Sequence, residues 1–301
     1  MKKQSKKFML AGVVLLAIAG LLALTSCKND SVPEQGTSVQ EETWLQEQKK
    51  ELDGKTEGTY TITAPSYLTK GGLVDIAKLL RDLPDGVLVD LDLSKATGLT
   101  YIAAGTFIDC SALKSVKLPS SVTEIGKYAF QSCTSLTSVT IPEGVTTIGD
   151  HAFEGCSSLT EVTILEGVTT IGDYAFAYTD LAKVTILEGV TTIGDSVFSG
   201  CEKLREVTIP ASVTEIGRYA FGSTGLTSVT IPKGVTTIEA YVFSGCADLN
   251  QVTFQNEDGW YTKNDLDDES PVSIKVDTPS TNAEKLREGD WHNKYLIRVE
   301  L

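Results

Sequence analysis

The chain has 301 residues, with 26 Lys and Arg against 40 Asp and Glu and a formal net charge of −14. This acidic balance excludes nucleic acid as the expected partner, because phosphate binding requires clustered Lys and Arg. With only two histidines, no zinc-type His pair and no glycine-rich phosphate loop, the sequence predicts no enzymatic activity, no cofactor and no metal site.

The N-terminal segment predicts export. Four lysines at positions 2, 3, 6 and 7 precede an apolar run from Phe8 to Leu24, and Thr25-Ser26-Cys27 follows. This end resembles a bacterial lipobox, in which the cysteine becomes the lipid-modified first residue of the mature protein. We expect residues 1–26 to be a lipoprotein signal peptide and Cys27 to be the lipidation site. A secretory signal beside a chance cysteine and a short uncleaved anchor are the alternatives.

Residues 27–56 are polar and read as a tether, although the run Gln40 to Leu52 could form a helix. Residues 57–98 are expected to form an N-terminal cap. It would begin with a strand at Tyr60-Thr-Ile-Thr and continue with an amphipathic helix ended by Pro84. A second strand, from Val87 to Leu93, would complete a lid on the repeats that follow.

Residues 99–253 repeat one unit of 22 or 23 residues, seen most clearly in Ile141 to Thr163. A degenerate copy ends at Lys117, and further copies begin at Leu118, Ile141, Ile164, Ile186, Ile209 and Ile231. This period, with Leu-x-x-Leu-x-Leu in each unit, predicts a leucine-rich-repeat solenoid of seven coils. The expected fold is an α/β repeat of β-rich coils. Each coil should hold two short strands, a glycine turn and an Ala-Phe segment with at most a little helix.

Stacked coils require the same position to be apolar in every copy. One such column is Phe107, Phe130, Phe153, Phe176, Phe198, Phe221 and Phe243. A second is Cys110, Cys133, Cys156, Cys201 and Cys246, with Thr179 and Thr224 in two coils. These cysteines are interpreted as buried hydrophobes rather than as disulfides or metal ligands, because side chains on successive coils point in parallel.

Two exposed columns are candidate binding surfaces. The outward positions of the Leu-x-x-Leu-x-Leu strands form the candidate ligand-binding face, named here the strand face: Lys117, Ser138, Thr140, Glu161, Thr163, Lys183, Thr185, Glu206, Thr208, Ser228, Thr230 and Gln251. A second candidate is an aromatic stripe: Tyr128, His151, Tyr174, Tyr219 and Tyr241. The alternatives are that threonine stands there for β propensity alone and that the stripe is half-buried packing.

Residues 254–301 are expected to form a small α+β C-terminal cap. Thr281-x-x-Glu284 indicates a capping box for a helix from Asn282 to Glu288. Trp260 and Trp291 should pack over the last coil, with a carbohydrate platform as the alternative. The acidic run from Asp265 to Glu269 is interpreted as a solvated turn rather than a calcium loop.

The repeat Ile-Gly-x-Tyr-Ala-Phe-x-x-Cys-x-x-Leu-x-x-Val-x-Ile-Pro resembles that of BspA-like surface proteins, known from spirochaetes and oral anaerobes. It departs from that pattern at Leu165 and Leu187, which replace proline, and at Thr179 and Thr224, which replace cysteine. The resemblance implies a non-enzymatic, lipid-anchored protein of the outer membrane or cell surface. It also implies an adhesin-like role, with host matrix proteins, other bacteria or glycans as partners. A structural envelope lipoprotein without a foreign ligand is the alternative.

Overall fold

The computed structural model describes residues 38–256, 260–263, 272–273, 279–287 and 295–298. The chain divides into two units, Met1–Gly36 and Thr37–Leu301, and all described residues belong to the second. The expected signal peptide and Cys27 therefore lie outside the described residues.

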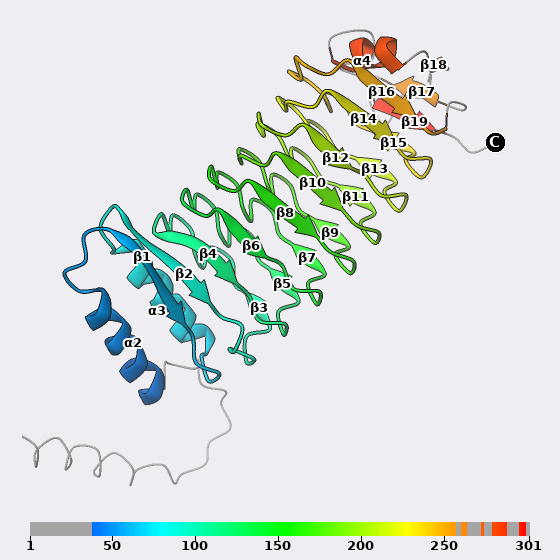
Figure 1. The fold of residues 1–301 in the computed structure, drawn as a ribbon. Coiled ribbons are helices and arrows are strands. Elements are labelled where there is room, and N and C mark those ends of the chain that lie inside the picture. The colour runs from blue at the N-terminus through cyan, green and yellow to red at the C-terminus, as the bar shows by residue number, and fades with distance from the viewer. Residues whose placement is uncertain (1–37, 257–259, 264–271, 274–278, 288–294, 299–301) are drawn as a thin grey trace, which may run out of the picture. The chain divides into compact units, whose positions relative to one another are not determined.

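The N-terminal part of the second unit adds two strands to the repeat. Strand β1 (Gly58–Thr63) pairs in parallel with β2 (Val87–Asp92), and β2 pairs in parallel with β4 (Leu113–Lys117) of the first coil. Helix α3 (Lys70–Arg81) lies between β1 and β2 in the chain, and Figure 1 shows it beside their sheet. The predicted strand, helix and strand are confirmed. Helix α3 begins where the Thr69 side chain accepts from the Gly72 N–H, and it buries Leu73, Ile76 and Leu80.

The helix that the run Gln40 to Leu52 allowed is present as α2 (Val39–Leu52), and it packs on α3 instead of belonging to a polar tether. This helix has no regular apolar stripe, but Leu45 and Leu52 are buried and Trp44 is partly buried against the core. Its anchor is the buried Glu41. The Glu41 carboxylate accepts from the Ser38 N–H at 2.8 Å and from the Thr69 backbone N–H and hydroxyl of the α3 cap.

Each coil contributes one strand to each of two parallel ladders (Figure 1). The ladder of the strand face contains β4 and then β6 (Ser138–Thr140), β8 (Glu161–Ile164), β10 (Lys183–Ile186), β12 (Glu206–Thr208), β14 (Ser228–Ile231) and β16 (Gln251–Phe254). The second ladder contains β3 (Tyr101–Ile102), β5 (Glu124–Ile125), β7 (Thr147–Ile148), β9 (Thr170–Ile171), β11 (Thr192–Ile193), β13 (Glu215–Ile216) and β15 (Thr237–Ile238). Residues at equal repeat positions pair, for example Val184 with Val162. The predicted solenoid of two-stranded coils is confirmed, and the Ala-Phe segments form turns without helix.

The core is a set of continuous columns. All seven phenylalanines of the predicted column are fully buried, and neighbouring rings stack with centroids 5.1 to 5.8 Å apart. The five cysteines of the second column are also fully buried. Close packing of this kind leaves the outward columns as the surface on which the coils differ from one another.

At the C-terminal end, the second ladder continues into antiparallel strands. Strand β19 (Tyr295–Arg298) pairs with both β15 and β17 (Trp260–Lys263), and β17 pairs with β18 (Val272–Ser273). Helix α4 (Pro279–Arg287) packs on β16. Trp260 is buried with its ring edge-on to Phe254, as predicted. Trp291 and residues 265–269 lie outside the described residues.

The predicted capping box at Thr281 is wrong, because α4 already begins at Pro279. Proline suits the first position of a helix, since its fixed φ is helical and the N–H that it lacks would have no partner there. Thr281 therefore stands inside the first turn, and the helix runs three residues earlier than expected at its start.

Candidate binding surfaces

The structure places the twelve strand-face residues on one side of the first ladder. Eleven of them are exposed, and the twelfth, Thr185, is half-buried. Between these positions the inward residues, such as Val162 and Val184, are buried. Lys183 and Glu206 form an exposed ion pair at 2.7 Å across neighbouring coils, a contact that contributes little to stability in water.

The strand-face ladder is interrupted between β12 and β14. Among the described strands, β1, β2, β4, β6, β8, β10 and β12 form one sheet, β14 pairs only with β16, and no pairing joins β12 to β14. Val207 of β12 is half-buried, whereas the corresponding Val184 and Val229 are buried. A hollow of about 490 Å³ opens at this break. It is lined by Glu188, Arg205, Glu206, Val207, Thr208, Ile209, Pro210, Ala211, Ser228, Val229, Thr230, Pro232 and Gln255.

Proline shortens the pairing beside this break. The N–H of Leu187 donates to the Ile164 oxygen, and the N–H of Gln255 donates to the Ile231 oxygen. These bonds follow the four-residue pairings of β8 with β10 and of β14 with β16. Pro232 stands at the equivalent position after β14 and has no N–H to donate toward the preceding coil. The replacement of proline by Leu187 thus adds one hydrogen bond between coils.

A smaller hollow of about 250 Å³ lies between β6 and β8, where only Ser138 and Glu161 pair. Its lining includes Ser138, Thr140, Glu161 and Thr163. The two hollows together are lined by eight of the twelve predicted face residues. Sequence reasoning proposed a regular face and did not reveal its two interruptions.

The aromatic stripe is built on an unusual backbone. Each member has a positive φ, from 55° at His151 and Tyr219 to 64° at Tyr241. The rings stack on one another, with centroids 4.8 Å apart for Tyr128 and His151 and 4.9 Å apart for His151 and Tyr174. Tyr219 and Tyr241 stack at 4.9 Å. Where two rings of the stripe stack, they cover each other's faces and leave their edges at the surface.

The stripe is interrupted at Ser196, which occupies the same repeat position in the fifth coil, with φ of 54°. The sequence pattern could have revealed this gap, since Ser196 stands two residues before Phe198 as Tyr174 stands before Phe176. Tyr174 and Tyr219, on either side of the gap, are the exposed members of the stripe, whereas Tyr128, His151 and Tyr241 are half-buried.

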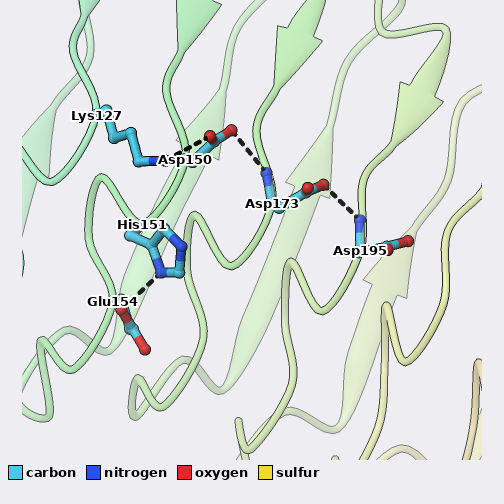
Figure 2. A network of polar contacts seen from close by, with 6 residues as sticks. All are labelled: Lys127, Asp150, His151, Glu154, Asp173 and Asp195. Carbon is cyan, nitrogen blue, oxygen red and sulfur yellow. Dashed lines mark hydrogen bonds and ion pairs between the residues drawn. The ribbon is translucent and has the colours of Figure 1, made fainter.

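A ladder of three aspartates precedes the stripe (Figure 2). The Asp150 carboxylate accepts from the Asp173 N–H at 3.2 Å, Asp173 accepts from the Asp195 N–H at 2.9 Å, and Asp195 accepts from the Arg218 N–H at 2.8 Å. Lys127 donates to Asp150 at 3.2 Å. The carboxylates therefore hold neighbouring coils together. In the last coil, burial raises the pKa of Glu239, and the charges of Asp195 and Glu215 reinforce this shift.

His151 lies beside this ladder and contacts a carboxylate of its own coil. Its Nδ1 is 2.8 Å from Oε2 of Glu154, and the same oxygen accepts from the Gln131 side chain at 2.6 Å. Figure 2 shows the imidazole and the Glu154 carboxylate side by side. This arrangement joins neighbouring coils, and among the described residues the hydrogen-bond partner of the imidazole is a carboxylate rather than a nucleophile, which agrees with the interpretation of His151 as a stripe residue.

The thiols of the cysteine column are buried and hydrogen-bonded to backbone oxygens. The thiol of Cys133 donates to the Phe107 oxygen at 3.0 Å, and Cys156 donates to the Phe130 oxygen at 3.1 Å. Burial raises the pKa of Cys201 to about 11 and that of Cys110 to about 12. Nucleophilic and metal-binding cysteines require the thiolate, so these residues are poor candidates for either role. The five are free of disulfides, as predicted.

Within the described ranges, no group of three or more His, Cys, Asp and Glu side chains is arranged to hold a metal ion. In the same part of the chain, no helix combines the length and the hydropathy needed to cross a bilayer.

Solved structures of bacterial repeat proteins resemble this chain. A leucine rich cell surface protein of Faecalibacterium prausnitzii A2-165 is 43% identical, with a TM-score of 0.51, over 54% of this chain and 44% of that chain. A leucine-rich repeat protein of Bacteroides ovatus is 28% identical over 53% and 54% of the two chains, with a TM-score of 0.36. One from T. pallidum is 32% identical over 48% and 78%, with a TM-score of 0.37.

The match to the F. prausnitzii protein thus covers less than half of that protein's length. No curated protein sequence matches the chain significantly. A family match described as "BspA type Leucine rich repeat region" covers residues 89–201 and 169–259 in six copies. Since this match spans more than half of the 301 residues and agrees with the stacked coils, the chain belongs to the BspA-type leucine-rich-repeat family.

Proposed function

We propose that this chain is a non-enzymatic surface protein that binds an extracellular protein or glycan partner through its strand face. The observation that carries the proposal is the coincidence of the two hollows with that face. Rigid parallel coils hold the lining side chains at fixed spacing, and preorganised side chains lose little entropy on binding. The hollow between β12 and β14 also presents charged side chains of both signs to a ligand, because Glu188 and Arg205 line it.

Two exposed threonines in the larger hollow provide the test. Thr208→Arg and Thr230→Arg would each fill part of the space between β12 and β14, whereas Thr170→Arg changes an equally exposed threonine of β9 in the second ladder. Full-length protein would be titrated against immobilised matrix proteins, bacterial cells and a glycan array. We expect at least one ligand whose binding falls about tenfold or more in the first two variants and is unchanged in the third.

Two results would argue against this proposal. A ligand bound equally by all three variants would place recognition elsewhere on the chain. Surface display without any bound matrix protein, cell or glycan would favour the envelope scaffold, which has no foreign ligand.

Lipid anchoring through Cys27 is a separate part of the proposal. The cell-surface description of the F. prausnitzii relative and the lipobox-like end at Cys27 support it. Cells fed an alkyne-labelled fatty acid should incorporate the label into the wild type and not into Cys27→Ala. Protease added to intact cells should remove the wild-type protein. Persistence of the label in Cys27→Ala would exclude Cys27 as the acylated residue.

A further inference from the structure

We propose that strand β1 pairs in solution with the β1 strand of a second copy of this chain. Among the described strands, β1 pairs with β2 alone, so its other side is an open edge of the sheet that carries the strand face (Figure 1). An open edge presents a row of backbone N–H and C=O groups that another strand can use. The proposed surface therefore consists of backbone groups at the N-terminal end of the solenoid.

The hydrogen bonds between β1 and β2 show which backbone groups of β1 face outward. The Ala64 N–H donates to the Asp92 oxygen of β2 at 2.8 Å, and the parallel register is unbroken from Gly58 to Thr63. Because backbone groups alternate sides along a strand, every second residue back from Ala64 faces β2. The residues between these face away from β2 with both their N–H and their C=O: Thr59, Thr61 and Thr63.

This edge lacks the features that usually prevent strand addition. Strand β1 reads Gly-Thr-Tyr-Thr-Ile-Thr, without a charged residue or a proline. Its pairing with β2 contains no bulge, and its three outward threonines are exposed. Natural sheets commonly protect an edge with charged residues, proline or bulges. The composition of β1 therefore indicates an edge that accepts another strand.

The described residues close the other ends of the two ladders. At the C-terminal end, β19 pairs with β15, and Asn282 of α4 donates to the Val252 oxygen of β16 at 3.2 Å. At the start of the second ladder, β3 has only two residues, and Lys70 of α3 lies over its Tyr101 ring, with Nζ 3.6 Å from the ring centre. A second copy thus offers β1 no open end strand except its own β1. Such a two-fold contact closes as a dimer and does not grow into a filament.

The sequence of β1 suits pairing with itself. An antiparallel pair centred on Thr61 places Thr59 opposite Thr63 of the second copy and forms about six backbone hydrogen bonds. On the other face it places the half-buried Tyr60 opposite Ile62 of the second copy. Aromatic and β-branched pairs of this kind stabilise sheets. No like charges meet within the paired strands, because β1 is uncharged.

The test is sedimentation velocity of the purified full chain over a concentration series, with three substitutions at one position. Thr61→Pro removes an outward N–H and no hydrogen bond to β2, so it should fold and weaken dimerisation about tenfold or more. Thr61→Lys keeps the N–H but places two like charges opposite each other, and it should weaken the dimer more at low salt than at high salt. Thr61→Val stays neutral and β-branched, and this control should dimerise as the wild type does.

Hydrogen exchange locates the contact. In the wild type, the amides of Thr59, Thr61 and Thr63 should become protected as the protein concentration rises. The amides of Tyr60 and Ile62, which face β2, should be protected at every concentration.

A wild type that stays monomeric would overturn the proposal, and so would a folded Thr61→Pro that dimerises as strongly as the wild type. The latter result would place the contact outside β1. This inference does not rest on ligand binding by the strand face. Thr208→Arg should leave dimerisation unchanged even if it abolishes binding of a strand-face ligand.

Discussion

Each core phenylalanine is bracketed by two residues with left-handed backbone, one two positions before it and one two positions after it. The first set is the aromatic stripe together with Gly105 and Ser196. The second set is Asp109, Ser132, Gly155, Tyr178, Gly200, Ser223 and Gly245. Residues other than glycine rarely adopt this conformation, which costs an L-residue roughly 1 to 2 kcal/mol. The turn is therefore imposed by the stacked coils rather than by local preference.

The second set makes a direct prediction, because glycine and serine both occur in it. Ser132→Gly should stabilise the fold by about 0.5 to 1 kcal/mol, since relief of the left-handed strain exceeds the greater chain entropy that glycine loses on folding. Ser132→Ala keeps the strain and should give no gain. Urea unfolding of the two variants would measure the difference. Equal stability of the glycine and alanine variants would show that φ of 57° at Ser132 carries no cost.

Buried thiols predict alkaline destabilisation. In the unfolded chain a cysteine ionises at its ordinary pKa of 9.0, whereas burial raises the pKa of Cys201 to about 11 and that of Cys110 to about 12. The unfolded chain therefore binds fewer protons between these values, and the free energy of unfolding falls as pH rises above about 9. We expect a loss on the order of 1 to 2 kcal/mol per thiol by about pH 10.5. Urea unfolding at pH 8 and 10.5 measures it, and Cys201→Thr, which copies Thr179, should show a smaller loss.

At the scale of single elements, the docking of helix α2 on α3 depends on Glu41. The buried Glu41 carboxylate completes the capping box of α2 with Ser38 and also accepts from the Thr69 N–H at the start of α3. A carboxylate at two helix N-termini is favoured by charge-assisted hydrogen bonds and by both helix dipoles.

Glu41→Ala should therefore release α2 from α3 at a cost of roughly 2 to 4 kcal/mol, while the coils remain folded. Glu42→Ala, an exposed carboxylate in the same turn, is the control. Hydrogen exchange should increase across residues 39–52 in the first variant and not in the second. Unchanged protection in Glu41→Ala would mean that Leu45 and Leu52 suffice to hold the helix.

Close contact between coils explains why a glycine stands directly before each aspartate of the ladder, as Gly172 stands before Asp173. A Cβ at Gly172 would lie 2.4 Å from the Asp150 nitrogen and 2.5 Å from its carboxylate oxygen. Gly172→Ala should therefore separate two coils and cost about 2 to 3 kcal/mol. Gly98→Ala, whose Cβ would come no closer than 3.8 Å to the Leu68 oxygen, is the control and should be nearly neutral. Thermal unfolding compares the two, and a neutral Gly172→Ala would contradict close contact between these coils.

At the scale of the whole molecule, repetition made the core predictable. The position of Phe153 is restated in every coil, so its burial follows from stacking alone. The docking of α2 was not predictable, because it rests on a single buried carboxylate, Glu41, in an otherwise polar segment. The break between β12 and β14 was also hidden, since the residues of these two strands follow the same repeat as those of the paired strands. The gap at Ser196 was visible in the sequence once the stripe was followed coil by coil.

The central claim is that identical coils stack so that phenylalanine and cysteine are sealed inside and only the outward faces can bind partners. Thiol labelling tests it most directly. A maleimide reagent applied to the folded protein, with modified sites located by mass spectrometry, should leave Cys133, Cys156 and Cys201 unlabelled, and all three should react after denaturation. Rapid labelling of these cysteines in the folded protein would contradict the stacked core and the binding surfaces inferred from it.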